Sequence, residues 1–142
     1  MGYTLDERAI QFISYFENIT GAAVDDCVQE EDRIIYIVKK GQAGLAIGKK
    51  GANIKKAMRD LNKEIEVIEN GESAEEFIRN ALAPAEIQEV TISEADEKKT
   101  ALVKIDTKFR GMAIGKGGVK IDRCKRLAAR HHEIDEVILT KS

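Results

Sequence analysis

The stretch Ala46–Ile54 reads AIGKKGANI, and the stretch Ala113–Ile121, which begins 67 residues further on, reads AIGKGGVKI. When the chain is aligned with itself at this offset, the eleven residues from Gly44 and the eleven from Gly111 share seven identities. Two copies are too few for a solenoid, which needs about three stacked repeats, but 142 residues suffice for two small domains. We therefore interpret the sequence as a duplicated domain, with one copy in residues 1–70 and the other in residues 73–142.

Each copy contains the same order of secondary-structure signals. Apolar residues at helical spacing come first, followed by two strand-like runs that a charged turn joins into an antiparallel hairpin. A short apolar helix, the glycine motif, a further helix and a final strand (residues 64–69 and 133–140) complete each copy. The order α-β-β-α-α-β predicts an α+β fold in which each domain packs a three-stranded sheet on helices.

Local signals also predict where single elements begin and end. Capping boxes are expected at Thr4 with Glu7 and at Ser73 with Glu76, each at the start of a helix. In the second copy, the polar run SEADEKK (residues 93–99) is expected to form the hairpin turn.

Two glycines separated by two residues predict a sharp turn between helices. Glycine adopts positive φ and lets another backbone approach closely. The turn leads into a helix N-terminus, where free N–H groups and the helix dipole favour a phosphate. Lys49 and Lys50 lie between the glycines of the first copy, and Lys116 and Gly117 between those of the second. A flexible lysine can follow a phosphate backbone without reading bases.

Positive charge is concentrated around the two motifs, although the net charge of the chain is −2. Residues 33–59 and 107–132 together carry 16 of the 23 Lys and Arg residues and a single acidic residue. The rest of the chain carries seven basic and 24 acidic residues. A local basic field of this kind favours a polyanionic partner such as RNA.

The pattern I-G-x-x-G-x-x-I, present at residues 47–54 and 114–121, resembles the signature of the K-homology (KH) domain. The G-x-x-G loop of KH domains clamps about four nucleotides of RNA backbone. A helix before each hairpin looks like the type II topology. The segments DRIIYIVKKGQAGLAIGKKGANIK (32–55) and EEFIRNALAPAEI (75–87) further resemble the tandem KH region of the NusA family, in particular its short archaeal members. The resemblance covers nearly the whole chain and implies RNA binding in transcription elongation or termination, with RNA polymerase as a candidate partner.

The candidate RNA-binding residues are the two glycine loops, the isoleucines beside them and neighbouring lysines. Aromatic residues make up 5% of the chain and none lies in either loop, so bases are expected on an aliphatic surface rather than on aromatic rings. A simple core role for the isoleucines stays equally open. The candidates are Ile47, Gly48, Lys49, Lys50, Gly51, Ile54, Lys55, Ile114, Gly115, Lys116, Gly117, Gly118, Lys120 and Ile121.

Enzymatic classes find little support in the sequence. A P-loop would require G-x-x-x-x-G-K-[ST], whereas GLAIGKK has three residues between its glycines and no Ser or Thr after the first Lys. Cys27 and Cys124 have no C-x-x-C partner and are expected to be buried thiols in a reducing compartment. His131 and His132 are adjacent, which fits a polar helix end better than a metal site. We therefore assign no catalytic residue, metal or cofactor.

Two other readings stay open: a KH-fold scaffold that binds protein, and an RNA-binding factor in ribosome or RNA processing. A titration with single-stranded RNA separates the first of these from the RNA-binding reading. The sequence has no apolar run of about 18 residues and no signal peptide. We therefore expect a soluble, cytoplasmic monomer without a membrane partner. We also expect it to lack the polymerase-binding and OB-type domains that precede the KH pair in bacterial NusA.

Overall fold

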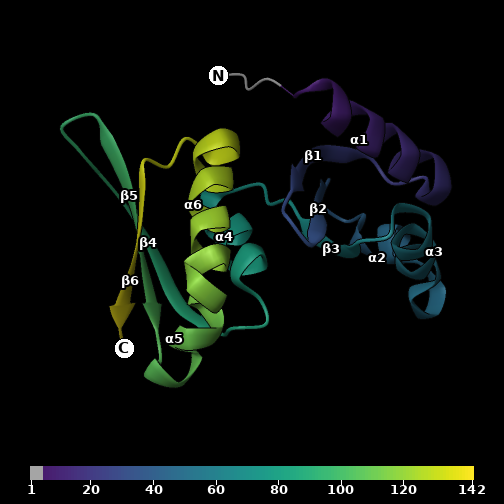
Figure 1. Ribbon diagram of the computed structural model, residues 1–142. Coiled ribbons are helices and arrows are strands. Elements are labelled where there is room, and N and C mark those ends of the chain that lie inside the picture. Colours follow the sequence, from purple (N-terminus) through teal and green to yellow (C-terminus); the bar gives the residue numbers. More distant parts are fainter. Residues whose placement is uncertain (1–4) are drawn as a thin grey trace. The chain divides into compact units, whose positions relative to one another are not determined.

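The structure is a computed structural model that describes residues 5–142 (Figure 1). The chain divides into two compact units, of which one ends at Asn70 and the other comprises Gly71–Ser142. The six strands form two separate three-stranded sheets, one in each unit. Among the helices of the described residues, none combines the length and the hydropathy needed to cross a bilayer.

The first unit has the predicted order of elements. A helix precedes the hairpin, and two helices joined by a short 3-10 turn, η1, precede the last strand. The elements are α1 (Glu7–Thr20), β1 (Val24–Gln29), β2 (Arg33–Val38), α2 (Ala43–Ile47), η1 (Lys49–Gly51), α3 (Ala52–Leu61) and β3 (Glu64–Glu69).

The second unit repeats this order, with a shorter first helix and several longer elements. Its hairpin strands and the helix after the glycine loop each exceed their counterparts in the first unit. The elements are α4 (Ala74–Leu82), β4 (Ile87–Ala95), β5 (Lys98–Ile105), α5 (Thr107–Ile114), η2 (Lys116–Gly118), α6 (Val119–His132) and β6 (Glu136–Lys141).

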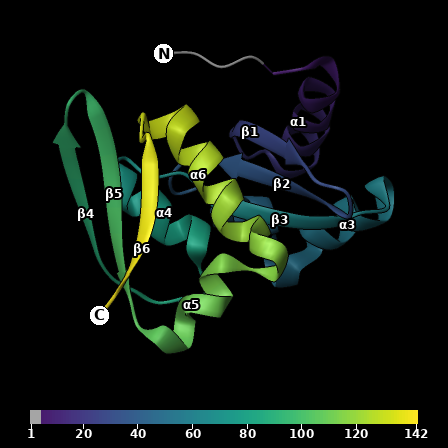
Figure 2. The same cartoon turned by 60° about the vertical axis from the view of Figure 1, so that its left-hand side comes forward.

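Both sheets have the same topology, in which the middle strand has one antiparallel and one parallel neighbour. β1 and β2 pair antiparallel and β3 pairs parallel with β2, and β4, β5 and β6 repeat this arrangement. Parallel neighbours require a crossover connection, which α2 and α3 supply in the first unit and α5 and α6 in the second. In the second unit, α4 and α6 cover one face of the sheet (Figures 1 and 2). The predicted α+β class and the α-β-β-α-α-β order are confirmed, and each glycine loop lies in the middle of a crossover.

The core of the first unit is built on one face of its sheet. The rings of Phe16 on α1 and Tyr36 on β2 are fully buried and stack with centroids 4.0 Å apart. The Tyr36 hydroxyl donates a hydrogen bond to the Phe12 carbonyl oxygen at 2.9 Å, so its polar group is satisfied inside the core. Gly21 ends α1 in the left-handed region and donates its N–H to the Glu17 carbonyl at 2.8 Å.

The two predicted capping boxes have different outcomes. The Ser73 hydroxyl accepts a hydrogen bond from the Glu76 N–H at 3.1 Å, as predicted for the start of α4. The predicted partner of Glu7, Thr4, lies outside the described residues. In the structure, the N-cap of α1 is Asp6, whose carboxylate accepts the Ala9 N–H at 2.7 Å. Asp6, a second residue able to cap a helix, is therefore the N-cap, and α1 begins at Glu7.

The turn predicted at residues 93–99 is wrong in length. β4 continues to Ala95 and β5 begins at Lys98, so only Asp96 and Glu97 form the turn, with φ of 53° and 62°. This left-handed pair suits the twist of a two-residue hairpin. Asp is common at the first position of such a turn, but the second position is usually Gly rather than Glu, so the residues alone did not indicate a two-residue turn. β6 likewise begins at Glu136 rather than residue 133, because α6 ends with Glu133 in the left-handed region.

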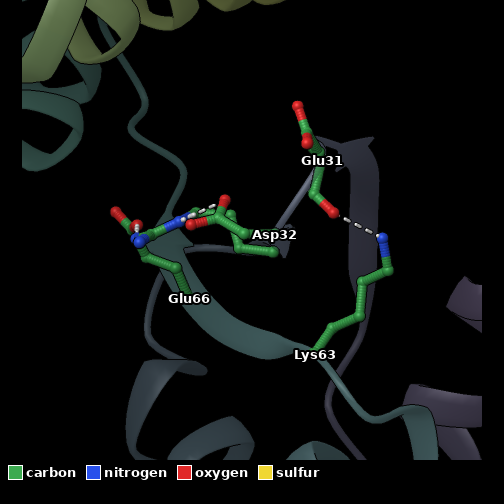
Figure 3. Close-up of polar contacts among 5 residues, drawn as sticks. Glu31, Asp32, Lys63 and Glu66 are labelled. Carbon is green, nitrogen blue, oxygen red and sulfur yellow. Dashed lines mark hydrogen bonds and ion pairs between the residues drawn. The ribbon is translucent and has the colours of Figure 1, made fainter.

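Polar contacts hold the last strand of the first sheet beside its neighbour (Figure 3). The Lys63 ammonium donates to the Glu31 carbonyl oxygen at 2.8 Å. The Arg33 guanidinium lies 3.4 Å from the Asp32 carboxylate and 3.2 Å from that of Glu66 on β3. The hydrogen bond from Arg33 lowers the pKa of Asp32. These contacts lie at the strand ends, where they favour the parallel register of β2 and β3.

Candidate nucleic-acid interface

The first glycine loop is a turn that requires glycine at its start. Gly48 has φ 82° and ψ 166°, a region that only glycine adopts readily. A Cβ atom at Gly48 would lie 2.9 Å from the backbone nitrogen of Asn53. The Asn53 side-chain amide donates to the Leu45 carbonyl oxygen at 2.9 Å and ties α3 back to α2. The Gly51 N–H donates to the Gly48 carbonyl at 3.0 Å and closes the turn.

The second glycine loop has the same backbone but a different tether. Gly115 has φ 78° and ψ 172°, and a Cβ there would lie 2.7 Å from the Cβ of Lys120. Lys120 aligns with Asn53, and its ammonium donates to the Ala83 carbonyl oxygen at 2.5 Å. One predicted phosphate ligand therefore also anchors its loop to the segment between α4 and β4.

The second of the two residues between the glycines differs between the loops. Lys50 adopts φ 55° and ψ 28°, a left-handed conformation, and Gly117 occupies the aligned position with φ 64° and ψ 16°. An L-residue pays roughly 1–2 kcal/mol for this conformation, whereas glycine does not. The first loop therefore retains a strained, exposed lysine where the second has the residue that the backbone prefers.

The positive charge around the loops is also distributed differently. Lys49, Lys50, Lys55 and Lys56 are all exposed beside the first loop. At the positions aligned with Lys55 and Lys56, the second unit has an exposed acid, Asp122, and a buried arginine, Arg123. The first loop thus carries the denser exposed positive charge, which is the part of an interface that attracts phosphates.

A groove of about 430 Å³ lies beside the second loop, between α5, α6 and the edge strand β6. The candidates Ile114 and Ile121 line it, together with Arg110 on α5, Lys125 on α6 and residues 135–139 of β6 and the segment before it. The sequence motif did not single out Arg110 and Lys125, because they lie outside its eleven repeated residues. A chain held at the second loop would have an aliphatic and polar surface next to it.

The four candidate isoleucines do not share one environment. Ile54 packs against the core of the first unit, and Ile121 is 8% exposed. Ile47 is 40% exposed, and Ile114 is half-buried in the groove wall. The aligned Leu45 and Met112, at 52% and 46% exposure, are further apolar side chains beside the loops. The sequence candidates did not include these two residues, although their alignment within the repeat could have pointed to them.

The helix that follows the first loop is held by a polar contact to α1. The Tyr15 hydroxyl donates to the Asp60 carboxylate at 2.5 Å, and the Lys56 ammonium lies 3.2 Å from the same carboxylate. The hydrogen bond from Tyr15, followed by that from Lys56, lowers the pKa of Asp60. Lys56 is thereby oriented along α3, near the loop that carries Lys49 and Lys50.

The cysteines do not form a reactive site. Cys27 and Cys124 are buried, as expected from the sequence, and burial raises the pKa of both thiols to about 12. A thiol of this kind stays protonated and is a poor nucleophile. Across residues 5–142, no three His, Cys, Asp or Glu side chains group in a way that could hold a metal ion.

Each unit matches a description of a known family. Residues 13–72 match the KH domain, and residues 74–141 match the NusA-like second KH domain. With a glycine loop in the crossover of each unit, the fold and the matches define a tandem KH-domain protein.

Similar proteins define the family more closely than the domain matches do. The "Probable transcription termination protein NusA" of Halococcus morrhuae is 38% identical over 98% of this chain and 99% of its own length. The protein of the same name from Methanocaldococcus jannaschii is 33% identical over 94% of this chain and 73% of its own length. The crystal structure of APE1850 has a TM-score of 0.80 at 30% identity and covers 96% of this chain and all of that one. The chain belongs to the NusA family of transcription termination proteins, among its archaeal tandem-KH members.

Proposed function

We propose that the chain binds single-stranded RNA through both glycine loops and acts as a NusA-like factor in transcription elongation or termination. The observation that carries this proposal is the pair of crossover turns, each of which presents exposed lysine at the N-terminus of a helix. Such a turn favours phosphate through free N–H groups, the helix dipole and the lysine charge. The names of the relatives, which are transcription termination proteins, supply the process.

The roles of the candidate residues follow from their positions. Gly48, Gly51, Gly115 and Gly118 shape the turns, Gly117 keeps the second turn open, and Lys49, Lys50, Lys55 and Lys116 contact phosphates. Lys120 keeps the second loop in place as well as adding charge. Bases lie on the apolar side chains beside the loops, with Ile47 and Ile54 in the first unit and Ile114 and Ile121 in the second.

A titration with fluorescently labelled single-stranded RNA tests the site. Reversing the charge of the first loop with Lys49→Asp and Lys50→Asp replaces two attractive charges by two repulsive ones, so affinity should fall by about tenfold or more. Lys116→Asp with Gly117→Asp should weaken binding at the second loop in the same direction. Both changes fall on exposed residues, so the fold should survive and circular dichroism should be unchanged.

The matched control is Lys104→Asp with Lys141→Asp, which changes the net charge of the chain by the same amount as the first pair. These exposed residues lie on β5 and β6, outside both loops and outside the lining of the groove beside the second loop. The control should bind RNA within about threefold of the wild type at moderate salt, because only the long-range field changes. If the control loses as much affinity as the loop variants, total charge and not the loops determines binding. If the wild type binds no single-stranded RNA, the protein-scaffold reading replaces this proposal.

The transcription role requires its own assay. Adding the wild-type chain to a reconstituted archaeal RNA polymerase should change pausing or termination, and the loop variants should change it less. RNA polymerase is the protein partner that this role implies, and co-purification with the chain tests that contact separately. If termination and pausing are unaffected while RNA binding is intact, the role in RNA processing or ribosome assembly becomes the better reading.

The remaining expectations are part of the same proposal. We propose domain boundaries at residues 1–70 and 73–142, which limited proteolysis tests by cleavage between Glu69 and Ala74. We propose a monomer, which light scattering tests. KH factors in general bind RNA without transforming it, and we propose no catalytic activity.

A further inference from the structure

The two units differ in where their positive charge lies relative to the groove. At the positions aligned with Arg110 and Lys125, the first unit has Ala43 and Met58, which are half-buried and uncharged. The first unit instead carries its lysines on and after the loop. The second unit therefore has fewer exposed cations at the phosphate-facing loop and two cations in the groove wall.

Neither cation of the groove is used by the fold. Within residues 5–142, no ion pair or hydrogen bond is formed by the Arg110 guanidinium or the Lys125 ammonium. Lys125 follows Ile121 by one helical turn, so both lie on the same face of α6. Arg110 and Lys125 thus offer free donors next to the apolar floor that Ile114 and Ile121 provide.

The groove also contains acceptors. Asp135 and Glu136, at the start of β6, belong to its lining. One Asp135 oxygen accepts the Lys99 N–H at 2.8 Å, and one Glu136 oxygen lies 3.4 Å from the Lys98 ammonium. Each carboxylate keeps a second oxygen with acceptor capacity. A base in the groove would therefore meet donors from the helices and acceptors from the strand.

We propose that the second groove selects a base that carries two adjacent acceptors together with an exocyclic amino group. This inference rests on the proposed function and adds the identity of the base to it. Guanine has O6 and N7 as adjacent acceptors with the N2 amine, and cytosine has O2 and N3 with the N4 amine. A planar guanidinium pairs bidentately with such acceptors, and a carboxylate accepts from the amine. Adenine has no adjacent acceptor pair, and uracil has no amine.

The two units accordingly have different roles in RNA binding. The lysine-rich first loop supplies affinity for the phosphate backbone that is independent of sequence. The second groove, through Arg110 as the main specificity-determining residue and Lys125 beside it, supplies discrimination among bases. This difference in role accounts for the unequal lysine content of the two loops. It also accounts for the unequal charge at the aligned positions 43 and 110 and at 58 and 125.

The test uses the full chain with Lys49→Asp and Lys50→Asp, so that the second unit dominates binding. The probes are RNAs of about eight uridines in which one central uridine is kept or replaced by adenosine, cytidine or guanosine. The RNA with guanosine or cytidine should bind about tenfold more tightly than those with adenosine or uridine only. Replacing the central guanosine by 7-deazaguanosine, or the central cytidine by 3-deazacytidine, removes one of the two adjacent acceptors and should abolish most of this preference. The substitution that weakens binding identifies which of the two bases the groove selects.

Arg110→Ala should reduce the preference to less than about twofold, and Lys125→Met, the residue of the first unit, should reduce it in part. The matched control is Lys108→Ala, which removes the same charge from an exposed position of α5 outside the groove. It should keep the preference. Equal binding of all four RNAs, or loss of preference in the Lys108 control as well, would overturn the inference and leave RNA binding by the loops intact. Failure of the wild-type chain to bind any of the four RNAs would instead remove the proposed function, and this inference with it. Where only the first-loop variant fails to bind, the same four RNAs are compared on the wild-type chain.

Discussion

Replacing Lys50 by glycine should make the protein more stable and a weaker RNA binder at the same time. Lys50 has φ 55° and ψ 28° inside the first loop, and its side chain is exposed. Relief of the left-handed strain contributes roughly 1–2 kcal/mol. The greater freedom of glycine in the unfolded chain offsets about 0.5–1 kcal/mol of this gain. The first unit should therefore gain about 0.5–1 kcal/mol in free energy of unfolding, or about 2–8 °C in Tm.

The same substitution removes a positive charge from the proposed phosphate site. Each phosphate that a lysine neutralises on a single strand contributes about −0.7 to the slope of log affinity against log salt. Lys50→Gly should therefore make the slope less steep by about 0.7 and lower the affinity at moderate salt. Fluorescence anisotropy at several salt concentrations measures the slope, and urea denaturation followed by circular dichroism measures the stability.

The reciprocal variant, Gly117→Lys, is the matched control. Its Cβ would meet no atom within 4 Å, so only the positive φ of 64° opposes the lysine. It should lose about 0.5–1 kcal/mol of stability and make the salt slope steeper by up to about 0.7. A destabilised Lys50→Gly protein would refute the strain argument. An unchanged salt slope in both variants would refute the contact with phosphate.

Three further predictions follow from the geometry. Gly48→Ala should destabilise the protein by about 1–3 kcal/mol, because its φ of 82° and ψ of 166° suit only glycine; Gly44→Ala, in an open helical position, should be neutral or slightly stabilising in the same denaturation assay. Burial, with a smaller effect from His131, lowers the pKa of His132 in the folded protein. Between that pKa and the ordinary histidine value of about 6.5, the unfolded chain binds more protons than the folded protein does. The free energy of unfolding should therefore fall as the pH is lowered from about 7 to 5, and less so in His132→Asn; equal pH slopes would contradict this. An RNA of about eight to twelve nucleotides should bind far more tightly than one of four, because contact with the second loop becomes intramolecular; equal affinities in anisotropy titrations would mean that the loops act separately.

The order of elements could be predicted because the signals for it are local. Apolar spacing gave the helices, and Ile121, Cys124, Leu127 and Ala128 are indeed buried on one face of α6. The length of the turn at Asp96 and Glu97 could not be predicted, because Glu97 occupies a left-handed position that usually holds glycine.

The glycine loops were predictable and the groove was not. The loops depend on residues adjacent in sequence, and the repeat made them visible. The groove depends on the packing of α5, α6 and β6, which brings Arg110 and Lys125 to residues 135–139. No local pattern marks two cations that belong to different helices. For the same reason, the tether from Lys120 to the Ala83 carbonyl reaches back 37 residues and is invisible in the sequence.

The parallel pairing of β2 with β3 bears on the order in which the elements of the first unit fold. Hairpin partners such as Gln29 and Ile34 are close along the chain, whereas Arg33 pairs with Glu64 across the whole crossover. Closing a longer loop is slower and costs more entropy, so the hairpin can form early and the edge strand docks last. During synthesis, the hairpin therefore leaves the ribosome before its parallel partner has been made. The same order applies to the second unit, where the groove is lined by α5, α6 and the parallel edge strand β6. That groove, the proposed site for a base, is therefore complete only when β6 has paired with β5.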